Sequence, residues 1–270
     1  MFRRGRTPGD DVSSTTEIEW TDATWNPIAG CSRVSAGCVN CYAERIAARF
    51  SGPGQPYAGL ATMTGSGPRW TGEVRLDKAK LGLPFKWRRP RRIFVNSMSD
   101  LFHPRVHDEW IVAVLATIAA APWHTFQVLT KRASRLAEWS RSVSHYPEGD
   151  RAHRPVMGWP PNAWVGVSVE NREHGRPRIE YLRRMPARVR FLSIEPLLED
   201  IGPIDLTGIG WVIVGGETGP RARPVDPDWI DRVIDQCRRA DVPCFVKNTG
   251  ARKIPFEQWP AEQRVREFPA

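Results

Sequence analysis

The chain has 270 residues, which is enough for one α/β barrel, and its hydrophobic content of 41% is typical of a globular protein. No stretch approaches the about 20 consecutive apolar residues of a membrane-spanning helix, so we predict a protein without a membrane partner. The net charge of +9 is compatible with binding to nucleic acid but does not specify it.

The amino-terminal residues are basic and are not followed by an apolar segment, so they do not form a secretory signal. We therefore predict a cytoplasmic protein, in a compartment that keeps thiols reduced. Residues 1–14 are predicted to be a disordered basic tail, and residues 15–270 are predicted to be a single domain. The first strand is predicted around residues 18–20.

Three of the five cysteines fall within eleven residues, at Cys31, Cys38 and Cys41. This spacing places three thiolates in one loop without an adjacent fourth cysteine. Iron–sulfur clusters that only carry electrons normally use four cysteine ligands. Three thiolates therefore favour a [4Fe–4S] cluster with one iron that is open to a cofactor or substrate.

A structural zinc ion is the alternative that the spacing leaves open, because zinc takes four ligands from Cys and His. Its fourth ligand would come from another part of the chain, and the candidates are His103, His107 and Cys244. Cys237 lies in a helical pattern and Cys244 in a strand pattern, where a small buried side chain is the simpler interpretation.

Apolar runs alternate with helical patterns along the rest of the chain, which predicts parallel strands joined by crossover helices. Long excursions are predicted near 51–70 and 144–162, and an added strand with a short helix within 70–87. The fold class is thus α/β, as a partial or complete (β/α) barrel of TIM type. Buried strands are predicted at 93–95, 126–129, 164–169, 189–194, 211–214 and 244–246, and helices at 108–121, 134–143, 176–185 and 227–240.

Polar residues follow each predicted strand, and in a barrel these carboxyl ends converge on the face where active sites are built. Glu195, Glu217 and Lys247 come directly after apolar strands, which favours a functional role for them. Asn171 is equally compatible with a helix cap. The complete set of candidates on this face comprises Lys131, Ser168, Glu170, Asn171, Glu195, Gly215, Gly216, Glu217 and Lys247.

The chain resembles the phage Gp37/Gp68 family, a family of unknown function whose cysteine loop is related to that of radical S-adenosylmethionine proteins. The resemblance spans residues 17 to 250. It is carried by motifs at residues 19–27, 31–44, 97–102, 129–132, 166–171, 193–197, 215–217 and 245–247.

The resemblance implies a barrel of the radical S-adenosylmethionine type, a cluster on the three clustered cysteines, and S-adenosylmethionine on the open iron. It implies no substrate. In that setting Lys131, Glu195 and Lys247 are candidate catalytic residues, and a one-electron donor is a required partner. The candidate cofactor-binding residues are Ser168, Glu170, Asn171, Gly215, Gly216 and Glu217.

Two other functions compete with this hypothesis. The first is a non-catalytic protein, stabilised by zinc or by a cluster, that binds DNA or RNA through its basic surface. The second is a metal-independent hydrolase with Glu195 and Glu217 as an acid/base pair, which leaves the cysteines without a role.

Overall fold

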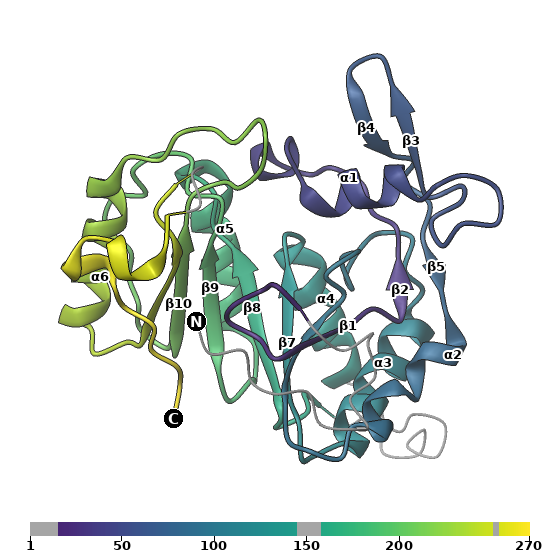
Figure 1. The fold of residues 1–270 in the computed structure, drawn as a ribbon. Helices are drawn as coiled ribbons and strands as arrows, with labels where there is room; N and C mark the ends of the chain where they lie inside the picture. Colours follow the sequence, from purple (N-terminus) through teal and green to yellow (C-terminus); the bar gives the residue numbers. More distant parts are fainter. Residues whose placement is uncertain (1–15, 145–157, 251–253) are drawn as a thin grey trace.

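Seven parallel strands form one curled sheet, a half-barrel, in the computed structural model of the protein, which describes residues 16–144, 158–250 and 254–270 (Figure 1). The edge strands β1 and β11 do not pair with each other within this described part. The sheet is therefore compatible with a partial (β/α) barrel and not with a closed one. In sheet order the strands are β1 (Ala23–Trp25), β6 (Arg92–Val95), β7 (Thr125–Thr130), β8 (Ala163–Ser168), β9 (Arg190–Ile194), β10 (Trp211–Gly215) and β11 (Cys244–Asn248).

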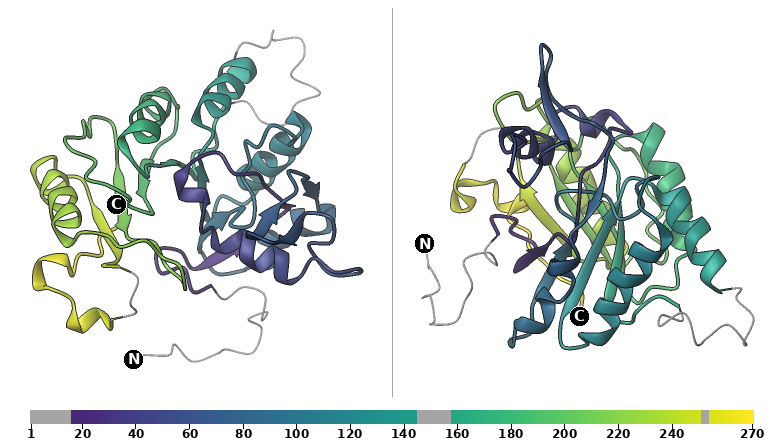
Figure 2. Two further views of the ribbon diagram at one scale, coloured as in Figure 1. Left: turned by 90° about the horizontal axis from the view of Figure 1, so that it is seen from above. Right: turned by 90° about the vertical axis from the view of Figure 1, so that its right-hand side faces the viewer.

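Four helices follow strands of the sheet and cover its outer face (Figure 2). All four are predicted by the sequence, but α5 begins four residues earlier than expected. Asn171 caps this helix, since its side-chain oxygen accepts the backbone N–H of His174 at 3.0 Å. The helices are α3 (Asp108–Ala120), α4 (Ala133–Ser144), α5 (Arg172–Arg183) and α6 (Pro227–Arg239).

The first strand lies at Ala23–Trp25, so the prediction of a strand at residues 18–20 is wrong. The chain reaches β6 only at Thr21 and Asp22: the Thr21 hydroxyl and the backbone N–H of Asp22 both donate to the carbonyl of Arg92 at 2.9 Å. Trp20 instead packs on the inner face of the sheet, with its ring 4.7 Å from that of Phe94.

The inner face of the half-barrel changes from aromatic to polar along its strands. On β9 the inward residues are Phe191 and Ser193, and Glu195 follows at the carboxyl end. Gly166 on β8 makes room for the Phe191 ring, because a Cβ atom there would lie 2.4 Å from a ring carbon. The aromatic residues fill the barrel at the amino end and leave the carboxyl end open for a polar site.

The first part of the segment between β1 and β6, which carries α1, β3 and β4, lies over the carboxyl end of the sheet (Figure 1). Within it, β2 (Ile28–Ala29) pairs with β5 (Arg75–Leu76), and β3 (Ala61–Thr64) with β4 (Gly67–Trp70) forms a hairpin beside α1 (Tyr42–Arg49). The excursion near 51–70 thus contains a hairpin, and the added strand and short helix expected within 70–87 are confirmed. The remaining short elements are α2 (Lys78–Leu81) and the 3-10 turns Ala36–Cys38, Leu83–Lys86, Phe256–Gln258 and Ala261–Gln263.

Two predicted features fall wholly or largely outside the described residues. These are the basic tail at 1–14 and the greater part of the excursion at 144–162. Among the helices that are described, none is both long and apolar enough to cross a membrane.

Candidate functional site

A cavity of about 230 Å³ opens at the carboxyl ends of the strands, beneath the segment that carries the clustered cysteines. Trp20, Phe94 and Leu129 give it an apolar inner end. The sequence-predicted residues that line it are Cys31, Cys38, Cys41, Lys131, Ser168, Glu195, Gly216, Glu217 and Lys247. Glu170, Asn171 and Gly215 are not among its lining residues.

The cysteine loop, residues 31–41, brings its three thiols to one wall of this cavity. Cys31 follows β2, Cys38 ends a 3-10 turn and Cys41 directly precedes α1. All three are free thiols. Burial raises the pKa of Cys31 from 9.0 to about 12, and the Asp100 carboxylate raises it further, whereas Arg132 opposes the shift. Burial also raises the pKa of Cys41.

Glu170 fastens the cysteine loop to the half-barrel. Its fully buried carboxylate accepts the hydroxyl of Ser35 at 2.8 Å and the N–H of Gly37 at 2.6 Å. It also forms ion pairs with Lys131 at 2.5 Å and with Arg178 at 3.0 Å. Burial would raise the pKa of this carboxyl, but the charge of Lys131 and the hydrogen bonds outweigh it and lower the pKa from 4.5 to about 2.

Glu217 binds the same loop at a second point. Its carboxylate accepts Asn40 Nδ2 at 2.8 Å and Arg223 Nη2 at 2.5 Å. Arg223 Nη2 also donates to the carbonyl oxygen of Ala36 at 3.1 Å. Burial acts to raise the pKa of Glu217, but the hydrogen bonds from Arg223 and Asn40 prevail and lower it. Both carboxylates of the predicted cofactor-binding set thus have partners within the protein.

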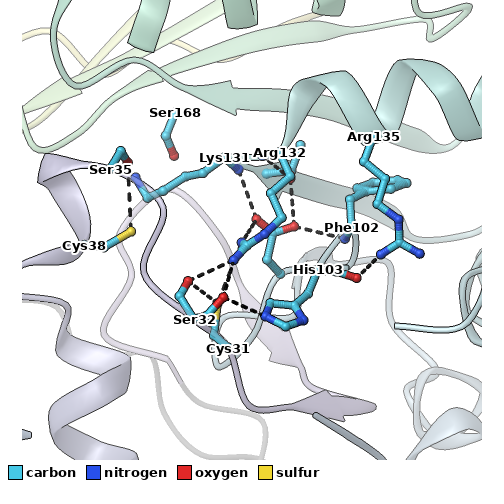
Figure 3. A network of polar contacts seen from close by, with 12 residues as sticks. Cys31, Ser32, Ser35, Cys38, Phe102, His103, Lys131, Arg132, Arg135 and Ser168 are labelled. Atoms are coloured by element: carbon cyan, nitrogen blue, oxygen red, sulfur yellow. Dashed lines mark hydrogen bonds and ion pairs between the residues drawn. The ribbon is translucent and has the colours of Figure 1, made fainter. Parts of the chain in front are cut away.

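Arg132 links the cysteine loop to the strand ends (Figure 3). Its guanidinium forms a buried ion pair with Asp100 at 2.9 Å and donates to the backbone carbonyl of Ser32 at 2.8 Å. The same Nη1 atom lies 3.8 Å from Cys31 Sγ. A fixed positive charge therefore stands beside one of the three thiols.

His103 and Arg132 both contact the Ser32 hydroxyl (Figure 3). Its Nδ1 accepts the backbone N–H of Arg105 at 3.2 Å, so the neutral ring donates Nε2–H to the Ser32 hydroxyl at 2.8 Å. Burial lowers the pKa of His103 from 6.5 to about 4, and the charge of Arg132 lowers it further. Both ring nitrogens are occupied, so neither is free to be a zinc ligand.

The other candidates for a fourth zinc ligand lie elsewhere. The ring of His107 packs against Trp110 with a centroid distance of 5.0 Å, next to the start of α3. Cys244 is buried on β11 and adjoins the buried Cys237 of α6, and hydrogen bonding to Cys237 together with burial raises its pKa. Within residues 16–144, 158–250 and 254–270, no three His, Cys, Asp or Glu side chains, the clustered cysteines included, lie close enough together to hold a metal ion as they stand.

Lys247 and Glu195 form an ion pair on the cavity wall, with 2.8 Å between Nζ and Oε1. Glu195 follows β9 and Lys247 lies in β11, so the pair spans the open end of the intervening strand β10. Lys247 is 29% exposed and Glu195 11% exposed, which leaves the pair accessible from the cavity. These two side chains are the predicted catalytic residues that the structure brings into direct contact.

A family model described as a protein of unknown function, DUF5131, matches residues 15–267. The chain belongs to this family. No curated protein and no solved structure matches it.

The sequence did not single out every residue of this DUF5131 site. Three residues that bind the predicted glutamates lie outside the strand-end motifs. They are Asn40 and Arg223, which bind Glu217, and Arg178, which binds Glu170. The signal available in the sequence was the excess of acids at strand ends, because a buried carboxylate requires a cation or several donors. That requirement predicts that partners exist but does not identify them.

Proposed function

We propose that this DUF5131 protein is an iron–sulfur enzyme of the radical S-adenosylmethionine type, related to the phage Gp37/Gp68 family, with its cluster on Cys31, Cys38 and Cys41. The observation that carries the proposal is that three free thiols of one loop line the same cavity as the polar ends of the barrel strands. Thiolates are the ligands that iron–sulfur clusters and zinc prefer.

The donor set fits a cluster better than it fits zinc. A structural zinc ion takes four protein ligands at about 2.0–2.3 Å, whereas a catalytic zinc ion takes three and a water molecule. Of the three candidates for the fourth ligand, His103 has both ring nitrogens engaged, His107 packs on Trp110, and Cys244 is buried beside Cys237. Three thiols without a fourth protein ligand are the set expected for a cluster with one open iron.

The residues around the cavity would bind and orient the cofactor and the substrate. When bound, a cluster with an open iron supplies the electron that cleaves S-adenosylmethionine. Ser168 and the Lys247–Glu195 pair lie on the cavity wall and offer hydroxyl, ammonium and carboxylate groups to a ligand. The apolar inner end at Trp20, Phe94 and Leu129 would exclude water. Glu170 and Glu217 would position the cysteine loop.

The hydrolase hypothesis fits the electrostatics less well. A general acid needs a raised pKa, yet the pKa of Glu217 is lowered by its partners, and Glu195 is paired with Lys247.

Nucleic acid remains a candidate substrate on the strength of the net charge alone. The arginine run at residues 88–92 precedes β6 and so lies at the amino end of the sheet, opposite the cavity.

Anaerobic reconstitution with iron and sulfide, followed by metal analysis, tests the proposal. We expect about four irons per chain and loss of the cluster on substitution of Cys31, Cys38 or Cys41 by Ala. Cys237→Ala is the matched control and should keep its iron. S-adenosylmethionine should perturb the paramagnetic resonance spectrum of the reduced protein and yield 5′-deoxyadenosine. Stoichiometric zinc without iron uptake would contradict the proposal and favour the binding protein.

A further inference from the structure

Exposed apolar side chains gather on the cysteine loop and on the elements next to it. Of the nine large hydrophobic side chains that are exposed in the described part of the chain, six lie between residues 34 and 63. They are between 41% and 65% exposed. Exposed apolar groups that cluster in this way mark an interaction surface. The six residues are Val34, Val39, Tyr42, Ile46, Phe50 and Met63.

Helix α1 forms the centre of this surface. Tyr42, Ile46 and Phe50 follow one another at intervals of four residues, so they lie on one face of the helix or at its end. Ala43 and Ala47 of the opposite face are buried in a small apolar cluster. The helix is therefore already anchored to the protein by its alanine face. Of the large side chains, Tyr42 lines the cavity and donates its hydroxyl to the carbonyl of Ser97 at 3.0 Å, whereas Ile46 and Phe50 belong to no apolar cluster of the described residues.

The charges around these apolar side chains are positive. Residues 31–72 contain four arginines, no lysine and a single acid, Glu44. Glu44 is 1% exposed and is paired with Arg33 at 2.5 Å. Within the described part of the chain, no ion pair joins a carboxylate to the remaining three arginines, which are Arg45, Arg49 and Arg69. A partner that covers this surface must bring carboxylates as well as apolar groups.

The composition favours a protein partner over a nucleic acid. Protein interfaces are enriched in Tyr, Phe, Met and Arg and depleted in Lys, which matches this surface. Nucleic acid would use the arginines and the two aromatic rings, but it would leave Val34, Val39 and Met63 uncovered. The surface therefore fits an acidic protein with an apolar patch.

We propose that the loop–helix surface, defined as the six apolar residues together with Arg45, Arg49 and Arg69, docks an acidic one-electron donor protein. The inference rests on the proposed function, which requires such a donor. Val34 and Val39 lie within the cysteine loop, so a protein seated on the surface touches the loop that holds the cluster. The donor loses one electron and the oxidised cluster gains it, and no atom is transferred.

The test uses reduced flavodoxin as the probe, because it is acidic and its reduced flavin donates one electron at a time. Binding to the full chain is measured by fluorescence anisotropy over a range of salt concentrations, and cluster reduction is followed by absorbance. The charge variant is Arg45→Glu/Arg49→Glu/Arg69→Glu, and the apolar variant is Ile46→Ser/Phe50→Ser. The matched control is Arg88→Glu/Arg89→Glu, whose exposed arginines lie at the opposite end of the sheet.

We expect both surface variants to weaken flavodoxin binding at least tenfold and to slow reduction by flavodoxin by a similar factor. Reduction by dithionite should be unchanged, and the control should behave as the wild type. Equal binding by all variants would overturn the inference. So would arginine-dependent binding of a single-stranded oligonucleotide without binding of flavodoxin. If no cluster assembles, the proposed function fails, while variant-dependent binding of flavodoxin would still support the docking surface.

Discussion

The carboxylate of Glu170 approaches Gly37 so closely that only glycine fits there. The backbone N–H of Gly37 donates to Glu170 Oε2 at 2.6 Å, and a Cβ atom at Gly37 would lie 2.4 Å from Glu170 Cδ. Gly37 directly precedes Cys38, so this contact sets the distance between the cysteine loop and the carboxyl ends of the strands. The loop between the cysteines is thus shaped by a residue on the strand side of the cavity.

Gly37→Ala should displace the cysteine loop. The added methyl group would have to push away a buried carboxylate that has four partners, so we expect a loss of several-fold in iron retained after reconstitution. Gly65→Ala is the matched control, because a Cβ atom there meets nothing within 4 Å. Iron content and chelator release rates provide the measurement, and equal retention in both variants would contradict the role given to this contact.

Glu170→Gln should destabilise the protein even without metal. The change leaves the charges of Lys131 and Arg178 without their buried partner, and breaking such a pair costs about 3–5 kcal/mol. Urea denaturation of the metal-free protein measures this cost. Glu180→Gln, which breaks an exposed pair with Arg183, should cost less than about 1 kcal/mol.

The same variant should alter the acid sensitivity of the fold. The pKa of Glu170 is lowered to about 2, so its contribution to stability is complete above the unfolded value of 4.5 and is lost as the pH falls toward 2. The difference in unfolding free energy between wild type and Glu170→Gln should therefore shrink over this range. A difference that is independent of pH would show that the carboxylate charge is not what stabilises the loop.

The strands and helices of the half-barrel were largely predictable because the hydrophobic periodicity that forms them is local. Strand β10 was expected at 211–214 and is found at Trp211–Gly215, and α6 was expected at 227–240 and is found at Pro227–Arg239. The first strand was predicted at the wrong place because Trp20 is buried without being part of a strand: its ring packs against Phe94 on the inner face of the sheet.

The site was predictable as a list of residues but not as a set of pairs. Strand ends marked Glu170, Glu195 and Glu217 as members of one face; Glu195 and Glu217 line the cavity, whereas Glu170 does not line it and binds the cysteine loop. The role of each glutamate depends on partners far away in the sequence, such as Arg178 and Asn40. Hydrophobic periodicity carries no information about these contacts. Glu170 is consequently a residue that positions the loop, although it shares a sequence pattern with Glu195.

His103 should make the stability of the protein depend on pH in the mildly acidic range. Its pKa is lowered to about 4 in the folded state from the usual 6.5 of an exposed histidine, so the unfolded chain binds the extra proton between these limits. Stability should therefore rise as the pH increases from about 4 to 6.5 and be insensitive to this group above that range. His103→Gln should remove this dependence, as measured by urea denaturation across the range.

Arg132 should raise the reduction potential of a cluster bound at Cys31, because hydrogen bonds and positive charge near the sulfur atoms stabilise the reduced state. Asp100→Asn/Arg132→Gln removes the buried pair together and leaves neither charge unpaired. We expect a lower midpoint potential with similar iron content in a redox titration. Arg132→Lys keeps the charge and should shift the potential less. An unchanged potential in the double variant would show that the guanidinium acts only on structure.

Glu195 and Lys247 should act on the ligand in the cavity rather than on the cluster. Glu195→Gln and Lys247→Gln should each lower the yield of 5′-deoxyadenosine at least tenfold while iron content stays unchanged, because these two side chains line the cavity and pair with each other, whereas Glu170 and Glu217 hold the cysteine loop. Glu199→Gln, four residues beyond Glu195 and not among the cavity-lining residues, is the matched control.

The double variant Glu195→Gln/Lys247→Gln tests whether the two residues function as a pair. Their ion pair at 2.8 Å should give a coupling of about 0.5–3 kcal/mol in a double-mutant cycle on the free energy of unfolding. Loss of iron in either single variant would place these residues in cluster assembly. Additive effects on both stability and cleavage would show that Lys247 and Glu195 contact the ligand independently, since a pair that acts together loses its function when either member is removed.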